Sequence, residues 1–153
     1  HLNMNRNLND ILLNYLFVFI QFGAISILLF TGPIFANDII LLIIELTGIF
    51  VAFWAIYSMQ MNNLSILPKL KVNAVFVNHG PYKIIRHPMY LSIIITFIPL
   101  IIEKFTWFRL ILFIVISIDL LFKLRYEERI LKDAFPEYSA YIDKTFRLFP
   151  CLF

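Results

Sequence analysis

Long apolar runs constrain the fold of this chain more than any other feature. Four of them follow one another along the sequence, at residues 11–30, 39–59, 90–102 and 105–121. Of the 153 residues, 61% are hydrophobic and only 15% are charged. A soluble domain of this size could not bury so much apolar surface, and about 20 helical residues match the hydrocarbon core of a bilayer. The sequence therefore predicts an all-α integral membrane protein.

Turn and capping residues separate these runs. A Thr-Gly-Pro sequence at 31–33 ends the first run, and Asn-Asp at 37–38 is a plausible cap for the second. The third run is short for a bilayer, so we expect its helix to begin near Pro88, in a first helical turn. The third and fourth helices should form a helical hairpin. We expect about four transmembrane helices, at residues 11–30, 39–59, 88–102 and 105–124.

The basic residues are distributed unevenly among the loops. Lys and Arg precede the first run, occur in the long middle segment and follow the last run, whereas the loop between the first two runs has none. Such a bias marks the cytoplasmic side, so we expect both termini and the active site to be cytoplasmic. The amphipathic tail from Tyr126, with Pro136 ending its helix, should form a cytoplasmic C-terminal cap. Residues 1–153 would be one domain, with cytoplasmic regions at 65–90 and 123–150.

A first polar segment lies at residues 80–90, at the start of the third apolar run. Charged groups at the ends of apolar runs are costly unless they form ion pairs or serve in binding or catalysis. Arg86 is a fixed cation for a carboxylate or phosphate, and His87 can donate, accept or shuttle a proton. Tyr82 and Tyr90 can supply aromatic faces and hydroxyl groups. The alternative is a cytoplasmic loop whose Arg and Tyr side chains anchor lipid headgroups.

A second polar segment follows the fourth run and contains Glu127 and Glu128. Adjacent helical residues point about 100° apart, so the two carboxylates cannot clamp one group together. One carboxylate could face a positively charged ligand. Its neighbour could pair with Lys123, Arg125 or Lys132. The alternative is a solvated row of ion pairs along the helix.

Two more acids lie inside expected membrane helices. Asp119 precedes Lys123 by one helical turn, so we expect the two side chains to pair. Glu45 has no partner nearby in the sequence and is expected to face the bundle interior, either as a tie between helices or as a catalytic group.

Other common chemistries have little support. The three histidines and single cysteine do not form a zinc pattern, so no metal is expected. There is no phosphate loop, dinucleotide fingerprint or nucleophile elbow. The basic residues are spread along one membrane face, which does not favour nucleic acid as a partner. The expected partners are the lipid bilayer and a small hydrophobic molecule.

A set of motifs extends over the two polar segments and the tail behind them. It comprises Gly80-Pro81-Tyr82, Arg86-His87-Pro88-Met89-Tyr90, Glu127-Glu128, Leu131, Phe135, Tyr138, Tyr141 and Pro150. This set resembles the isoprenylcysteine carboxyl methyltransferase-like family, whose wider group includes phospholipid methyltransferases. The resemblance covers about residues 65–150. It implies S-adenosylmethionine-dependent methyl transfer at the membrane surface to a lipid-like or small hydrophobic acceptor, with O-methylation of an isoprenylcysteine carboxylate most resembled.

The resemblance also implies roles for individual residues. The cofactor would be held by Ala74, Val75, Phe76, Val77, Tyr82, His87, Pro88, Met89 and Tyr90, with Glu127 at its cationic amino-acid end. The catalytic group would comprise Arg86, His87, Lys123, Arg125 and Glu128. The family places a substrate-contacting Arg where this chain has Lys123, so either Lys123 or Arg125 would meet the acceptor, and Lys grips a carboxylate less directionally. A Gln of some members corresponds to Leu67 here.

Methyl transfer is an in-line displacement, so the protein mainly aligns the reactants and excludes water. A carboxylate acceptor needs no base, whereas an amine or thiol could use His87 or Glu128. A lipid-like acceptor would enter laterally between helices, and the cofactor from the cytoplasm. Two alternatives remain. A membrane reductase using NADPH would share the Arg-His-Pro-Met-Tyr element but not the paired glutamates, and a non-catalytic membrane subunit would not need the clustered polar groups.

Overall fold

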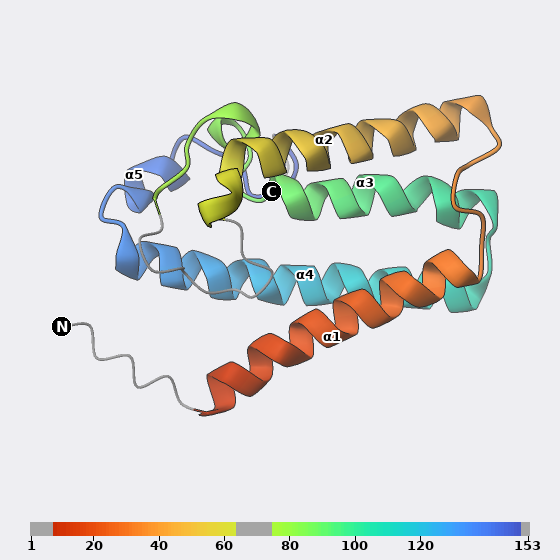
Figure 1. The fold of residues 1–153 in the computed structure, drawn as a ribbon, viewed down its shortest axis with the longest axis horizontal. Helices are drawn as coiled ribbons and strands as arrows, with labels where there is room; N and C mark the ends of the chain where they lie inside the picture. The colour runs from red at the N-terminus through yellow and green to blue at the C-terminus, as the bar shows by residue number, and fades with distance from the viewer. Residues whose placement is uncertain (1–7, 64–74, 151–153) are drawn as a thin grey trace.

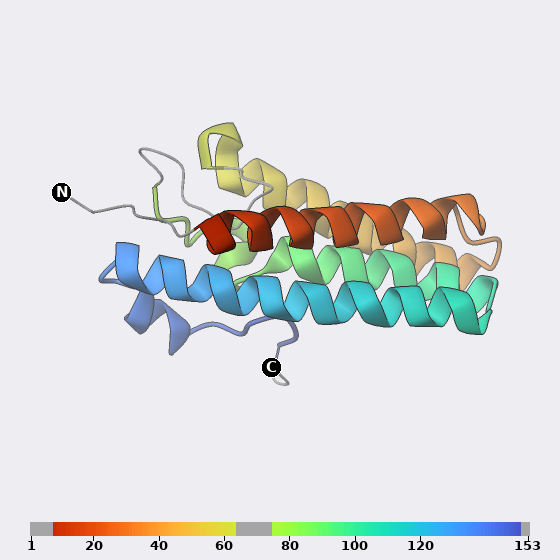
Figure 2. The same cartoon turned by 90° about the horizontal axis from the view of Figure 1, so that it is seen from below.

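Four long helices form the body of the protein in this computed structural model, which describes residues 8–63 and 75–150 (Figure 1). The elements are α1 (Leu8–Phe30), α2 (Ile39–Asn63), η1 (Gly80–Lys83), α3 (Pro88–Glu103), α4 (Trp107–Ala134) and α5 (Tyr138–Ile142). Helix α2 packs along α3, and α1 packs along α4 (Figures 1 and 2). Within the described ranges there is no strand, and β-type pairing is limited to one parallel bridge between Ile85 and Phe146. The prediction of an all-helical protein is confirmed.

Local sequence signals set the helix ends much as predicted. Asp38 Oδ1 accepts hydrogen bonds from the backbone N–H groups of Ile40 at 2.9 Å and Leu41 at 3.1 Å, which caps α2. Pro88 occupies the first turn of α3. Helix α4 continues unbroken beyond the expected membrane segment and ends at Ala134, just before Pro136. The expected hairpin exists as the short connection between α3 and α4, although α3 contacts α2 more extensively than α4.

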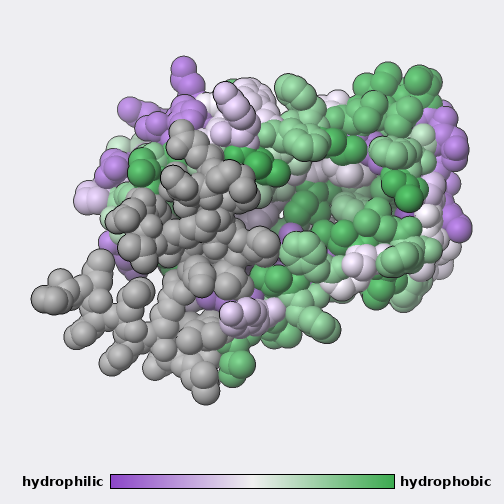
Figure 3. All heavy atoms as spheres, in the orientation of Figure 1, coloured by the Kyte–Doolittle hydropathy of each residue, from purple (hydrophilic) through white to green (hydrophobic). Residues whose placement is uncertain are grey.

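Among the described residues, two helices are long and apolar enough to cross a membrane. The qualifying segments are Leu12–Phe30 in α1 and Ile39–Met59 in α2, whereas α3 is a shorter apolar helix. Large apolar side chains are widely exposed on these helices, including Phe19 at 77% and Tyr57 at 85%. Figure 3 shows hydrophobic residues over the middle of one face and hydrophilic residues toward its ends. An apolar surface of this extent indicates association with lipid.

Two buried charged side chains hold the end of the bundle where α1 joins α2. Arg109 donates to the carbonyl oxygens of Leu28 at 2.8 Å and Leu100 at 2.9 Å, near the C-terminal ends of α1 and α3. A cation is favourable at these carbonyls. Glu45 accepts a hydrogen bond from the backbone N–H of Ala36 at 2.9 Å. Glu45 is buried, as expected. Its hydrogen bond ties the connecting loop to α2, which differs from the expected tie between two helices.

Gly48 allows α2 and α3 to approach closely. A Cβ atom at this position would lie 2.5 Å from Thr96 Oγ1 and 2.7 Å from the Thr96 backbone nitrogen. Because the backbone cannot yield without moving α3, we expect Gly48→Ala to lower the free energy of unfolding by about 1–3 kcal/mol. Thermal unfolding in detergent measures the effect. Gly23→Ala is the matched control, since no atom lies within 4 Å of its Cβ position; an equal loss in both variants would contradict this explanation.

Candidate active site

The segment before α3 begins with a turn that requires glycine. Gly80 has φ +60°, and a Cβ atom there would lie 2.1 Å from Ser58 Oγ on α2. This turn starts η1 and buries Pro81 and Tyr82. The chain then reaches His87, which precedes Pro88 at the start of α3. The glycine thus holds the polar segment against the end of α2.

The C-terminal tail pairs with this segment through its backbone. Arg86 N donates to Phe146 O at 2.8 Å, His87 N donates to Arg147 O at 3.1 Å, and Phe146 N donates to Ile84 O at 2.9 Å. The Arg86 side chain adds hydrogen bonds to Ile142 O and to both oxygens of Thr145. These bonds bring residues after α5 next to the residues before α3.

Glu128 is the buried centre of an ion-pair cluster. Its Oε1 lies 2.9 Å from Arg86 Nε, and its Oε2 lies 3.1 Å from Arg147 Nη2. His87 Nε2 is 3.5 Å from Oε1, too far for a good hydrogen bond, and has no hydrogen-bond partner in the described chain. Burial raises the pKa of Glu128, but His87, Arg147 and Arg86 outweigh it and hold the pKa at about 2. Glu128 is therefore a fixed, compensated anion.

Glu127 has a different environment from its neighbour. Its Oε1 accepts a hydrogen bond from the Tyr90 hydroxyl at 2.5 Å, and its Oε2 lies 3.7 Å from His87 Nδ1. The rings of His87 and Tyr90 stack with centroids 5.5 Å apart. The Glu127 side chain keeps 23% exposure, against 5% for Glu128, and among the described residues no Lys or Arg forms an ion pair with it. Glu127 can therefore accept a cationic group from outside.

Lys123 lies one turn before Glu127 and is buried at 3% exposure. Its Nζ donates to Gln21 Oε1 on α1 at 3.1 Å and lies 5.3 Å from the centre of the Tyr90 ring. The predicted pairing with Asp119 does not form a direct ion pair, although the two charges attract each other at a longer distance. Asp119 Oδ2 is buried without a hydrogen-bond partner in the described chain. Packing of α1 against α4 offers Lys123 the Gln21 oxygen instead.

The pairing expected between one glutamate and a cation of the same helix does not form. The cations that neutralise Glu128 come from distant segments and not from Lys123, Arg125 or Lys132, so that expectation is wrong. Arg125 is exposed on α4. It follows Lys123 by about 200° around the helix, which directs it away from the cluster. Of the two cations proposed to meet the acceptor, the structure brings only Lys123 to this site.

An aromatic cluster covers the site on the side of the tail. Phe76 contacts the rings of Phe135, Tyr138 and Tyr141, with centroid distances of 5.1–5.9 Å. The Tyr141 hydroxyl donates to the carbonyl oxygen of Tyr82 at 2.5 Å. Burial raises the pKa of Tyr141 to about 12, so the hydroxyl keeps its proton at neutral pH. The cluster therefore joins η1 to α5.

The remaining residues expected at the cofactor vary in position. Pro88 is buried, and Met89 and Val77 are half-buried. Val75 is mostly exposed. Ala74 lies outside the described residues, as does Leu67. The structure thus brings together Arg86, His87, Tyr90, Lys123, Glu127 and Glu128, with Tyr82 and Phe76 alongside.

The family model for phospholipid methyltransferases matches residues 37–138 of this chain. The match covers more than half of the sequence and includes α2, η1, α3 and α4. The chain belongs to the phospholipid methyltransferase family. This membership confirms the predicted resemblance and implies methyltransferase activity at a membrane. A comparison with curated proteins finds no match.

Some residues beside this phospholipid methyltransferase-family site were not singled out from the sequence. Arg147 lies 19 positions after Glu128, and no local spacing connects the two. Gln21 could have been found, because Asn14 and Gln21 are polar residues seven positions apart in an apolar run and therefore share a helical face. Both are buried in the structure. Uncharged polar residues within an apolar run, and not only charged ones, can therefore indicate a buried polar contact.

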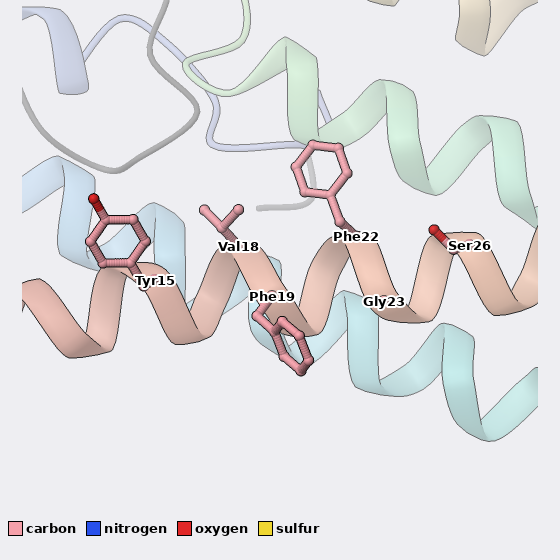
Figure 4. A pocket seen from close by; sticks show the side chains of 6 residues that line it. All are labelled: Tyr15, Val18, Phe19, Phe22, Gly23 and Ser26. Atoms are coloured by element: carbon pink, nitrogen blue, oxygen red, sulfur yellow. The ribbon is translucent and has the colours of Figure 1, made fainter.

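This member of the phospholipid methyltransferase family has an apolar pocket on α1. It is lined by Tyr15, Val18, Phe19, Phe22, Gly23 and Ser26. Figure 4 shows Tyr15, Val18 and Phe22 projecting from one side of the helix and Phe19 from another. Gln21, which holds Lys123, lies between these lining residues in the sequence. The pocket is thus carried by the helix that also reaches the polar cluster.

Proposed function

We propose that this protein is an S-adenosylmethionine-dependent methyltransferase that acts at the membrane surface on a lipid-like or small hydrophobic acceptor. The difference between two adjacent carboxylates carries the proposal. Glu128 is neutralised by Arg86 and Arg147, whereas Glu127 is partly exposed and is oriented by Tyr90. A partly exposed carboxylate beside stacked His87 and Tyr90 rings, with no Lys or Arg ion-pair partner among the described residues, suits a cationic ligand.

The residues present fit the proposed cofactor. Glu127 would bind its cationic amino-acid end, and the Tyr82 hydroxyl, buried without a hydrogen-bond partner among the described residues, could bond a polar group of it. Phe76, Val77 and Met89 would add apolar contacts, as would Ala74 and Val75. When bound, the cofactor supplies an electrophilic methyl group on a sulfonium. The remaining work of the protein is alignment and exclusion of water.

His87 is the best candidate for moving a proton. A carboxylate acceptor would need no base, whereas an amine or thiol acceptor must lose a proton. Glu128 is poorly suited to this task, because a carboxylate with a pKa near 2 is a weak proton acceptor at neutral pH. His87 Nε2 makes no hydrogen bond within the described segments, and the Glu128 carboxylate 3.5 Å away can attract a proton on it. The tail bonded to Arg86 would help to exclude water while the transfer occurs.

The proposal includes a membrane arrangement. All four long helices would cross the bilayer, with both termini and the site on the cytoplasmic side and the tail as a cap. The basic residues before α1, between α2 and α3 and after α4 support this orientation. The acceptor would arrive laterally through the apolar helices, and an isoprenylcysteine-type carboxylate or a phospholipid headgroup would both suit such a route.

Calorimetric titration of the detergent-purified protein with S-adenosylmethionine, and separately with NADPH, tests the proposed function. We expect saturable binding of S-adenosylmethionine and none of NADPH. Binding of NADPH alone would favour the membrane reductase. Binding of neither ligand by folded protein would favour a non-catalytic subunit.

A further inference from the structure

We infer that Gln21 of α1 is a positioning residue for the methyl acceptor, because it holds the Lys123 ammonium ready for an anionic group of that molecule. The inference rests on the proposed function and adds a residue to it. Helix α1 lies outside residues 37–138, the part matched by the family model. The contact is therefore made by a helix that the family match does not include.

Lys123 is a buried cation that Glu127 and Asp119 attract without approaching to ion-pair distance. Among the described residues, no carboxylate forms an ion pair with its Nζ. Residues 1–7, 64–74 and 151–153 contain no Asp or Glu. Asp10 lies near the start of the same helix, about 16 Å along its axis from Gln21. Burying an ammonium without a carboxylate in direct contact is costly, so its remaining N–H donors suit an anionic group of a ligand.

Gln21 gives this ammonium a defined place. The amide oxygen accepts one of the three N–H donors of Lys123 at 3.1 Å, and the Tyr90 ring lies 5.3 Å from the same nitrogen. Two donors remain for a ligand. The Tyr90 hydroxyl in turn binds Glu127. The series Gln21, Lys123, Tyr90 and Glu127 thus connects the acceptor side of the site with the carboxylate proposed to bind the cofactor.

The chemistry of Lys123 selects acceptors that carry an anionic oxygen group near the reacting atom. A lipid carboxylate and a lipid phosphate both meet this requirement. A flexible lysine needs orientation more than an arginine does, because its ammonium is a point charge on a mobile stem. Gln21 supplies that orientation.

Steady-state methylation by Gln21→Ala and Gln21→Glu tests the inference, with N-acetyl-S-farnesylcysteine in micelles and phosphatidylethanolamine in vesicles as the two probes. In Gln21→Ala we expect the acceptor KM to rise about tenfold, with the dissociation constant of S-adenosylmethionine changed by less than about twofold. Gln21→Glu keeps the side-chain size and would pair with Lys123 directly. It should therefore fold normally and still raise the acceptor KM, whereas a merely structural role predicts wild-type kinetics.

Phe17→Leu is the matched control, because Phe17 is buried on α1 and is not bonded to Lys123. We expect it to lower the thermal midpoint without changing the acceptor KM. An effect on one probe only would assign the carboxylate or the phosphate as the recognised group. Equal KM effects in Phe17→Leu and Gln21→Ala, an unchanged KM in Gln21→Glu, or methylation of neither probe by wild type that binds S-adenosylmethionine would each overturn the inference. Failure of wild type to bind S-adenosylmethionine would instead overturn the proposed function, and the inference with it.

Discussion

Glu127→Ala should weaken S-adenosylmethionine binding by about 100-fold, or about 3 kcal/mol. The substitution removes the partly exposed carboxylate that is hydrogen-bonded to Tyr90 and has no Lys or Arg as an ion-pair partner in the described chain. A cationic ligand would lose its counter-charge while the ion pairs of Glu128 remain. Calorimetric titration in detergent measures the change.

Two further variants separate charge from shape at this position. Glu127→Gln keeps an oxygen for the Tyr90 hydroxyl but lacks the charge, so its affinity should fall by about tenfold, less than in Glu127→Ala. Glu137→Ala removes an exposed acid before α5 and should bind the cofactor as wild type does. Wild-type affinity in Glu127→Ala would remove this residue from the cofactor site.

Glu128→Ala should have the largest effect on stability, a loss of about 3–5 kcal/mol in the free energy of unfolding. The variant leaves the buried Arg86 guanidinium without its carboxylate and also breaks the contact with Arg147. The tail should then separate from the segment before α3. Thermal unfolding in detergent without cofactor measures this loss independently of ligand binding.

Graded variants guard against a Glu128→Ala protein that does not fold. Arg147→Ala should cost about 1 kcal/mol, because its side chain is 33% exposed and Arg86 still neutralises Glu128. Glu127→Ala should unfold nearer to the wild-type temperature than Glu128→Ala. If the two glutamate variants unfold at the same temperature, the ion-pair cluster around Glu128 does not hold the tail in place.

The helices could be predicted closely because their signals are local. The bounds of α1 and α2 follow from long apolar runs, and Asp38 and Pro88 mark helix starts through their own hydrogen bonding and backbone geometry. The end of α4 before Pro136 has the same origin. The main deviation is that α4 and the amphipathic tail form one continuous helix to Ala134. No helix-breaking residue separates them, so the change from apolar to polar composition does not interrupt the backbone.

The polar contacts could be predicted only in part. Arg86, His87, Glu127 and Glu128 were expected on one side of the helices, and the structure brings them together. Spacing along α4 did not identify the ion-pair partners of Glu128 or the hydrogen-bond partner of Lys123. Helical spacing shows only which residues of the same helix lie near each other. A buried charge pairs with whichever opposite charge or polar group another segment brings closest.

By itself, the sequence determined an all-helical chain with apolar helices long enough for lipid, a polar segment before α3 and a second one within α4. Those features depend on residues close together in the chain, namely hydrophobic periodicity, caps and prolines. Only the tertiary structure decided that Glu128 is neutralised by Arg86 and Arg147, that Glu127 stays accessible, and that Lys123 is held by Gln21. These contacts depend on how α1, the segment before α3 and the tail pack around α4. A buried polar group must bond to whichever group another segment of the chain brings next to it.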